Sequence, residues 1–85
     1  MDERTILKEV REYVIENFLL GEEADELSDS ESFLESGLID STGILEVIAF
    51  LEETYDVEIE DEEMIPENLD SVQRVARFIA SKKGL

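Results

Sequence analysis

The sequence predicts an all-α fold, a small bundle of three main helices plus one short helix. Three segments, over residues 3–20, 41–54 and from 70 onward, repeat apolar residues at the spacing of an amphipathic helix. The strand-like stretch YDVEI has no second strand to pair with, and an isolated strand would leave its backbone groups without partners. Leu, Ile, Val and Phe make up about a third of the chain, well above the ~20% below which disorder is expected. With 85 residues, we expect a single domain over residues 1–85 with one core.

The first helix is expected over residues 3–20, with Asp2 as its N-cap and Gly21 as its C-terminal stop. The apolar positions of its core face are Ile6, Leu7, Val10, Tyr13, Val14 and Phe18. A long polar connection follows, and long connections in compact domains are often functional. We expect Phe33 to anchor this connection and Ser30 or Ser32 to begin a short helical turn.

The second main helix is expected from about Ser41 to Thr54, with the carboxylate of Asp40 as its N-cap. Four apolar residues recur at helical spacing and should face the core: Ile44, Val47, Ile48 and Leu51. Residues 55–59 are then expected to form an extended connector.

A short acidic helix is expected over residues 61–65, ending near Pro66. The last main helix should begin at Asp70, which has the capping-box spacing to Gln73. Its core face is expected to comprise Val72, Val75, Ala76 and Ile79, and Lys82 and Lys83 suit the negative end of its dipole.

Charge is distributed very unevenly along the chain. The net charge is −17, and no Lys or Arg lies between Glu12 and Gln73, a segment that holds every acidic residue except Asp2, Glu3 and Glu9. Such a field repels phosphate backbones, so we expect no nucleic-acid partner. It attracts basic protein surfaces and speeds encounter with them, which favours a role in protein binding, although solubility alone explains many acidic surfaces.

The composition also excludes several kinds of catalytic and metal site. Without Cys or His, the chain can form neither a disulfide, nor a histidine-based acid–base pair, nor the usual zinc ligand set. EF-hand frames starting at Asp25 and Asp56 lack the glycine of the calcium loop. The dense carboxylates and short chain leave little room for a substrate cleft, so we expect no enzyme activity. With no membrane-spanning stretch and no signal peptide, a cytoplasmic protein without membrane insertion is expected.

Ser41 begins the most informative pattern in the chain. Ser41, Leu45 and Ala49 fall at i, i+4 and i+8 and therefore share one stripe of the second helix. Carboxylates flank this stripe: Glu46, Glu52 and Glu53. A phosphate attached to the hydroxyl would meet the free N–H groups and positive dipole end of the helix, so the position suits a phosphodiester.

These segments together resemble the acyl carrier protein family and the related aminoacyl carrier proteins. The resemblance covers most of the chain: the first amphipathic helix, the long loop, GLIDS (37–41), ILEVIAFLEETYDVEIEDEE (44–63) and LDSVQRVARFI (69–79). It implies a freestanding, monomeric carrier in fatty-acid biosynthesis or in specialised lipid or secondary metabolism. Such a carrier holds an acyl or aminoacyl group as a thioester and presents it to partner enzymes with basic docking patches.

The resemblance also implies roles for individual residues. Ser41 would carry covalent 4′-phosphopantetheine, transferred from coenzyme A by a phosphopantetheinyl transferase, and Asp40 would assist recognition by that transferase and its magnesium ion. The implied partner-docking residues are Thr42, Leu45, Glu46, Ala49, Glu52 and Glu53. The implied lining of an acyl cleft comprises Ile48, Leu51, Ile59 and Met64.

Two positions depart from the pattern of fatty-acid carriers. Thr42 stands where leucine is common, and Gly43 stands where an acidic residue is frequent. Ordinary variation at surface positions and a change of partner both remain open. GLIDSTG is closer to the D-alanyl carriers and LEETYDVEIEDEE to the fatty-acid carriers, so a fatty acyl, polyketide or aminoacyl cargo remains possible.

Two functions outside the carrier class also fit the composition. One is an unmodified acidic interaction module that binds or blocks a basic partner protein with the same helix. The other is a divalent-ion buffer, which would show saturable, stoichiometric calcium binding. Ser41 distinguishes the carrier from the module, because only the carrier requires its hydroxyl.

Overall fold

The computed structural model of the chain describes residues 2–19 and 27–85, and within these ranges it contains helices and no strand. In chain order the elements are α1 (Glu3–Val14), the π-helical turn η1 (Ile15–Leu19), α2 (Phe33–Ser36), α3 (Ser41–Tyr55), the 3₁₀ turn η3 (Asp61–Glu63), α4 (Pro66–Leu69) and α5 (Val72–Lys82). The predicted all-α class with three main helices is therefore confirmed. Among the described residues, no helix has the length and apolar character needed to cross a membrane.

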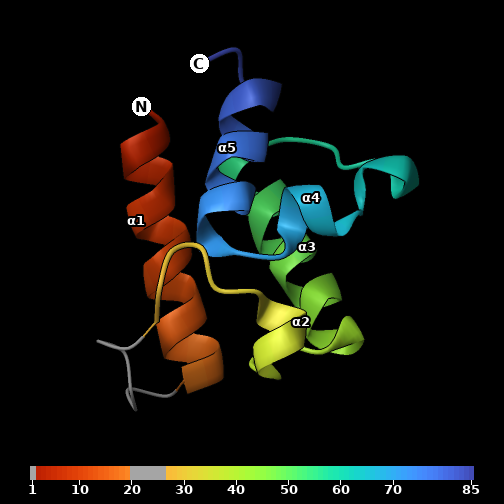
Figure 1. Cartoon of the computed structure of the whole chain (residues 1–85). Helices are drawn as coiled ribbons and strands as arrows, with labels where there is room; N and C mark the ends of the chain where they lie inside the picture. Colours follow the sequence, from red (N-terminus) through yellow and green to blue (C-terminus); the bar gives the residue numbers. More distant parts are fainter. Residues whose placement is uncertain (1, 20–26) are drawn as a thin grey trace.

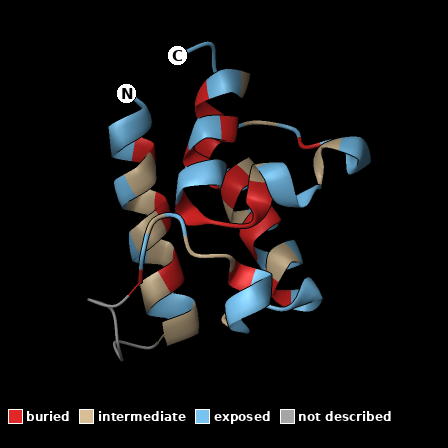
Figure 2. Cartoon of the chain, in the orientation of Figure 1, coloured by how far each residue is buried: buried red, intermediate tan, exposed pale blue. Residues whose placement is uncertain are grey.

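The core lies between α1, α3 and α5. In Figure 1, α1 and α5 run side by side and place both chain ends at the same end of the molecule. Their facing sides carry the buried residues in Figure 2. The fully buried side chains include Ile6, Val10 and Val14 of α1, Val47 and Leu51 of α3, and Val75 and Ile79 of α5. These are the periodic apolar positions of the sequence, as expected for helices that bury one face.

The first predicted helix is an α-helix up to Val14 and continues as a turn of π-helix. The Asp2 carboxylate accepts from Thr5 N at 2.9 Å and so caps α1 as predicted, and this bond lowers the pKa of Asp2. After Val14 the chain continues as η1, where Asn17 Nδ2 donates to Tyr13 O at 2.9 Å. In a regular α-helix the backbone N–H of residue 17 would bond this carbonyl, whereas here the side-chain amide of the same residue does so. The predicted end of this helix, with its stop at Gly21, lies outside the described residues.

The connection before α3 contains the short helical turn predicted for it. Of the two serines considered, Ser32 is the N-cap of α2, since its hydroxyl accepts from Glu35 N at 3.1 Å. Phe33 is fully buried and anchors the segment, as expected. Gly37 ends α2 at φ 77°, in the left-handed region that glycine reaches without steric cost.

Helix α3 begins as predicted and differs from prediction on one face. The Asp40 carboxylate accepts from Gly43 N at 2.7 Å, which confirms Asp40 as the N-cap. Ile44, expected in the core, is only half-buried. Gly43 is buried, so of the two explanations left open for it, ordinary variation at a surface position does not apply. The cause is close packing, because a Cβ at Gly43 would lie 2.8 Å from Ile39 Cγ2 and 3.1 Å from Phe18 Cε1.

Side chains bond the extended connector after α3 and the end of the helix that precedes it. Residues 57–60 have no regular secondary structure, so the connector predicted over 55–59 is found from residue 57 on, whereas Tyr55 is the last residue of α3. The carboxylate of Glu52 accepts from Ile59 N at 3.0 Å, and Lys83 Nζ donates to Tyr55 O at 2.8 Å. Lys83 therefore stabilises the C-terminal end of α3, although its proximity to the end of α5 had suggested a role there.

Two predictions for the C-terminal half were wrong. The acidic helix over 61–65 is only the 3₁₀ turn η3, and Pro66 begins α4 rather than ending a helix. Proline suits the first helical position, where no N–H is needed. Ser71, not Asp70, caps α5, accepting from Arg74 N at 3.1 Å, while the carboxylate of Asp70 bonds residues of the earlier connection.

Candidate functional site

Ser41 is the first residue of α3, and its side chain is exposed. Because Asp40 already accepts the N–H of Gly43, the carboxylate fixes where the first turn of the helix starts. The remaining first-turn N–H groups have no intrahelical partner and, with the dipole, create a positive end next to the hydroxyl. Ser41 thus combines an accessible hydroxyl with an environment that favours a phosphate.

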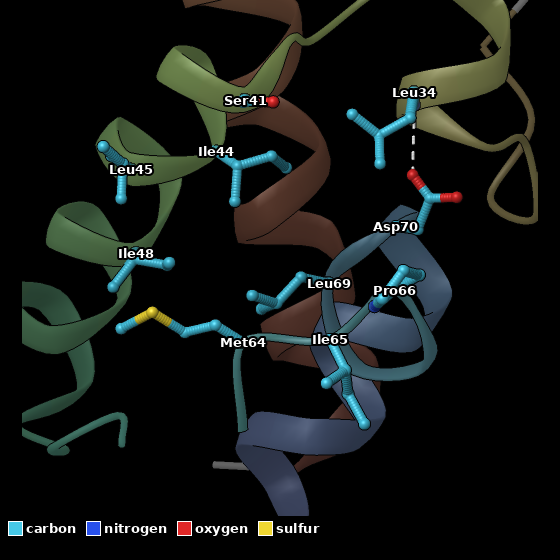
Figure 3. A pocket seen from close by; sticks show the side chains of 10 residues that line it. All are labelled: Leu34, Ser41, Ile44, Leu45, Ile48, Met64, Ile65, Pro66, Leu69 and Asp70. Carbon is cyan, nitrogen blue, oxygen red and sulfur yellow. Dashed lines mark hydrogen bonds between the residues drawn. The ribbon is translucent and has the colours of Figure 1, made fainter. Parts of the chain in front are cut away.

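An apolar pocket of about 310 Å³ opens beside Ser41. Figure 3 shows Leu34 from α2, Ile44, Leu45 and Ile48 from α3, and the segment from Met64 to Leu69 arranged around it. The residues that line it are Leu34, Ser41, Ile44, Leu45, Ile48, Met64, Ile65, Pro66, Leu69 and Asp70. Only Ser41 and Asp70 contribute polar side chains, so the pocket suits a hydrocarbon chain attached at its mouth.

The structure brings two of the four predicted cleft residues to this pocket. Ile48 and Met64 line it from opposite sides, and in Figure 3 the thioether of Met64 points toward Ile48. Leu51 and Ile59 are buried in the core and do not line it. They lie farther along α3 and the connector, toward the end of the molecule away from Ser41.

Most residues predicted to dock partners share one exposed surface of α3. Leu45 is 61% exposed, an unusual state for a large apolar residue, and is the most exposed of the large apolar side chains described. Thr42, Glu46, Ala49 and Glu53 are also exposed. We call these five residues, with Ser41, the α3 surface.

Glu52 differs from its neighbours on α3. It is half-buried, and one carboxylate oxygen is bonded to Ile59 N. This side chain fastens the extended connector to the helix. The predicted docking role of Glu52 stays a prediction, and only the carboxylate oxygen that is not bonded to Ile59 N is free of this bond.

Neighbouring groups shift the pKa values of two side chains outside the pocket lining, Tyr13 and Glu63. Burial, and then the negative charge of Glu46, raise the pKa of Tyr13, whose hydroxyl donates to Glu46 O at 3.2 Å. The hydrogen bond from Lys82 and the backbone bond from Glu60 N lower the pKa of Glu63 in η3. At neutral pH the carboxyl group of Glu63 is therefore ionised, and the hydroxyl of Tyr13 is neutral and donates its hydrogen bond.

Several pocket residues were missed by reasoning from the sequence. Leu34, Ile65, Pro66, Leu69 and Asp70 come from segments treated as loop or as helix ends. A proline after two apolar residues, MIPENL, was an available signal that a helix starts at Pro66. The sequence carries no comparable signal for Leu34, because its position depends on a contact with Asp70, 36 residues later.

Comparison with known proteins agrees with this site. The family model of the phosphopantetheine attachment site matches residues 8–79. A curated acyl carrier protein of Akkermansia muciniphila is 32% identical over 84 residues, covering 99% of this chain and 100% of that protein. The chain belongs to the acyl carrier protein family. An acyl carrier protein of Bdellovibrio bacteriovorus is 36% identical over 75 residues, covering 88% of this chain and 90% of that protein.

The fold gives the same result. The solution structure of a holo acyl carrier protein from Nitrosomonas europaea superposes with a TM-score of 0.75, at 28% identity, covering 93% of this chain and 96% of that one. The cofactor of the chain is therefore covalently attached 4′-phosphopantetheine. The site fits this group, since an exposed hydroxyl lies at a helix N-terminus and opens onto an apolar pocket.

Proposed function

We propose that the chain is a carrier without catalytic activity, in which Ser41 bears 4′-phosphopantetheine and the pocket beside it shelters the cargo. The observation that carries the proposal is the adjacency of the exposed Ser41 hydroxyl and the apolar pocket. The chain has no cysteine, and 4′-phosphopantetheine supplies the thiol that it lacks. This thiol holds the acyl group as a thioester.

Asp40 and the start of α3 prepare Ser41 for modification. The bond from Gly43 N to the Asp40 carboxylate fixes the turn that presents the hydroxyl. Asp40 remains exposed, so its second oxygen can face the transferase and its magnesium ion. The positive end of the helix stabilises the phosphodiester that is formed.

The α3 surface is the proposed docking face for the transferase and for acyl-processing enzymes. Leu45 and Ala49 supply apolar contact next to Ser41, and Glu46 and Glu53 attract basic patches. The absence of Lys and Arg from residues 13 to 72 strengthens this attraction.

The lining of the pocket supports an acyl cargo over an aminoacyl one. A hydrocarbon chain gains by leaving water, whereas the ammonium of an aminoacyl group would lose hydration against Ile44, Ile48 and Leu69. This supports a role in fatty-acid or specialised lipid metabolism.

The attachment is tested by intact mass after incubation with coenzyme A, magnesium and a broad-specificity phosphopantetheinyl transferase. The parent chain should gain one phosphopantetheinyl group and Ser41→Ala none. Thr42→Ala is the matched control, because it removes the adjacent exposed hydroxyl and should still be modified. Modification of Ser41→Ala, or no modification of a parent chain shown to be folded by circular dichroism, would refute the assignment.

A further inference from the structure

Asp70 is a buried residue whose carboxylate lines the pocket, and the proposed function gives it no role. It lies between α4 and α5 and is 9% exposed. One carboxylate oxygen accepts from Leu34 N at 3.0 Å, a bond drawn in Figure 3, and the other accepts from Ser32 Oγ at 2.5 Å. Its backbone carbonyl accepts from Phe33 N at 3.0 Å. One residue thus makes three bonds to the start of α2.

Together with the buried side chain of Phe33, these bonds hold α2 in place. A helix of four residues has too few internal bonds to be stable alone. Its first-turn N–H groups need partners, and Asp70 satisfies those of Phe33 and Leu34. Ser32 satisfies that of Glu35 and is itself held by Asp70.

The position of α2 in turn determines one wall of the pocket. Leu34 is the residue that α2 contributes to the lining, and it is 46% exposed, so packing against the core holds it only in part. The other walls are firmer, since α3 is a helix of 15 residues, and Ile48 of α3 and Leu69 of α4 are 5% and 3% exposed. The wall at Leu34 therefore depends most on hydrogen bonds for its position.

We infer that Asp70 is a positioning residue that holds the α2 wall closed beside Ser41 and so sets how well an attached acyl chain is shielded from water. The inference rests on the proposed function, because it assumes a cargo attached through Ser41. Loss of the carboxylate leaves the N–H of Leu34 and the hydroxyl of Ser32 without their partner. The wall then opens more often while the core between α1, α3 and α5 stays formed.

The test measures how fast hydroxylamine cleaves an octanoyl thioester on the loaded chain. Asp70→Ala should raise the cleavage rate roughly tenfold, equivalent to about 1.4 kcal/mol and within the range for a buried group that loses its bond. Leu34→Ala, which removes the wall itself, should raise the rate similarly. Asp70→Asn keeps one acceptor oxygen and should give a smaller increase.

The control separates positioning from general loss of stability. Tyr55→Phe removes the bond from Tyr55 Oη to Glu9 Oε1, 2.7 Å long and away from the pocket lining. At matched fractions of folded protein it should leave the cleavage rate unchanged. An increase in Tyr55→Phe equal to that in Asp70→Ala, or no increase in Asp70→Ala, would overturn the inference.

Amide hydrogen exchange on the unloaded chain tests Asp70 independently of the attachment. Asp70→Ala, which removes the acceptor of the Leu34 N–H, should speed exchange at Leu34 relative to Val75, whose N–H bonds Ser71 O in α5. Equal acceleration at both amides would overturn the positioning role. A chain that shows the selective effect but cannot be loaded at Ser41 would sink the proposed function alone.

Discussion

At the scale of single residues, Gly43 shows how packing constrains the first turn of α3, which begins at Ser41, the proposed attachment residue. The glycine lies where Ile39 and Phe18 approach the first turn of α3, which leaves no room for a Cβ. Gly43 is therefore a packing requirement, and a surface explanation of this departure from fatty-acid carriers does not hold. Thr42 is exposed, and nothing in the structure explains it.

Gly43→Ala should destabilise the fold despite the higher helix propensity of alanine. Propensity alone would favour alanine by about 1 kcal/mol. A Cβ 2.8 Å from Ile39 Cγ2 forces repacking, which typically costs about 1–3 kcal/mol. We expect a net loss in urea unfolding and slower phosphopantetheine transfer, because Asp40 also lies against the new methyl group. Thr54→Ala, at an exposed position of α3 outside the α3 surface, is the control, and a Gly43→Ala variant more stable than the parent would disprove the packing argument.

Single residues also mark where reasoning from the sequence succeeds and where it stops. Asp40 and Asp2 were predictable as caps because their partners lie three residues away. Asp70 has the same local pattern but bonds α2, since a buried carboxylate goes where unsatisfied N–H groups are. Ile44 was placed in the core by its spacing, and only the position of α2 and α4 makes its surroundings a pocket.

At the scale of elements, the long helices can be predicted from the periodicity of apolar residues in the sequence. The short helices depend on tertiary contacts that the sequence does not show. The faces of α1, α3 and α5 could be predicted because each repeats apolar residues over several turns. Helices α2, α4 and the turn η3 have four, four and three residues. In such short segments capping and tertiary bonds decide the structure, which is why η3 and α4 were not separated and the role of Pro66 was misjudged.

The connector after α3 should depend on Glu52 more than on its neighbour Glu53. Glu52→Ala leaves the N–H of the buried Ile59 without an acceptor, a loss of about 1–3 kcal/mol. Glu52→Gln keeps an acceptor oxygen and should cost less, and Glu53→Ala, on an exposed side chain, should stay within about 0.5 kcal/mol. Urea unfolding of the three variants measures these effects. Equal losses for Glu52→Ala and Glu53→Ala would contradict the proposed bond.

At the scale of the whole molecule, the net negative charge opposes folding. The net charge of −17 is carried by 85 residues, and the described ion pairs are few, Arg11 with Asp29 and Lys82 with Glu63. Repulsion among the remaining carboxylates destabilises the compact state, while the same field would attract the basic partners proposed above.

The melting temperature should therefore rise with added sodium chloride. Screening that relieves about 1 kcal/mol of repulsion would raise it by roughly 4–8 °C in a domain of this size. A variant with two exposed carboxylates removed, Glu58→Gln with Glu60→Gln, should melt higher at low salt and respond less. A melting temperature that stays flat or falls across the series would count against charge repulsion.

The central claim at this scale is that the fold brings an attachment hydroxyl and an apolar pocket together so that the cargo enters the protein. Methyl NMR spectra of the octanoyl-loaded chain, compared with the phosphopantetheinylated chain without acyl group, test it most directly. We predict large shifts at Ile44, Ile48 and Leu69 of the pocket and small ones at Val10 and Val75 of the core. Unchanged pocket methyls in a chain loaded at Ser41 would contradict the account.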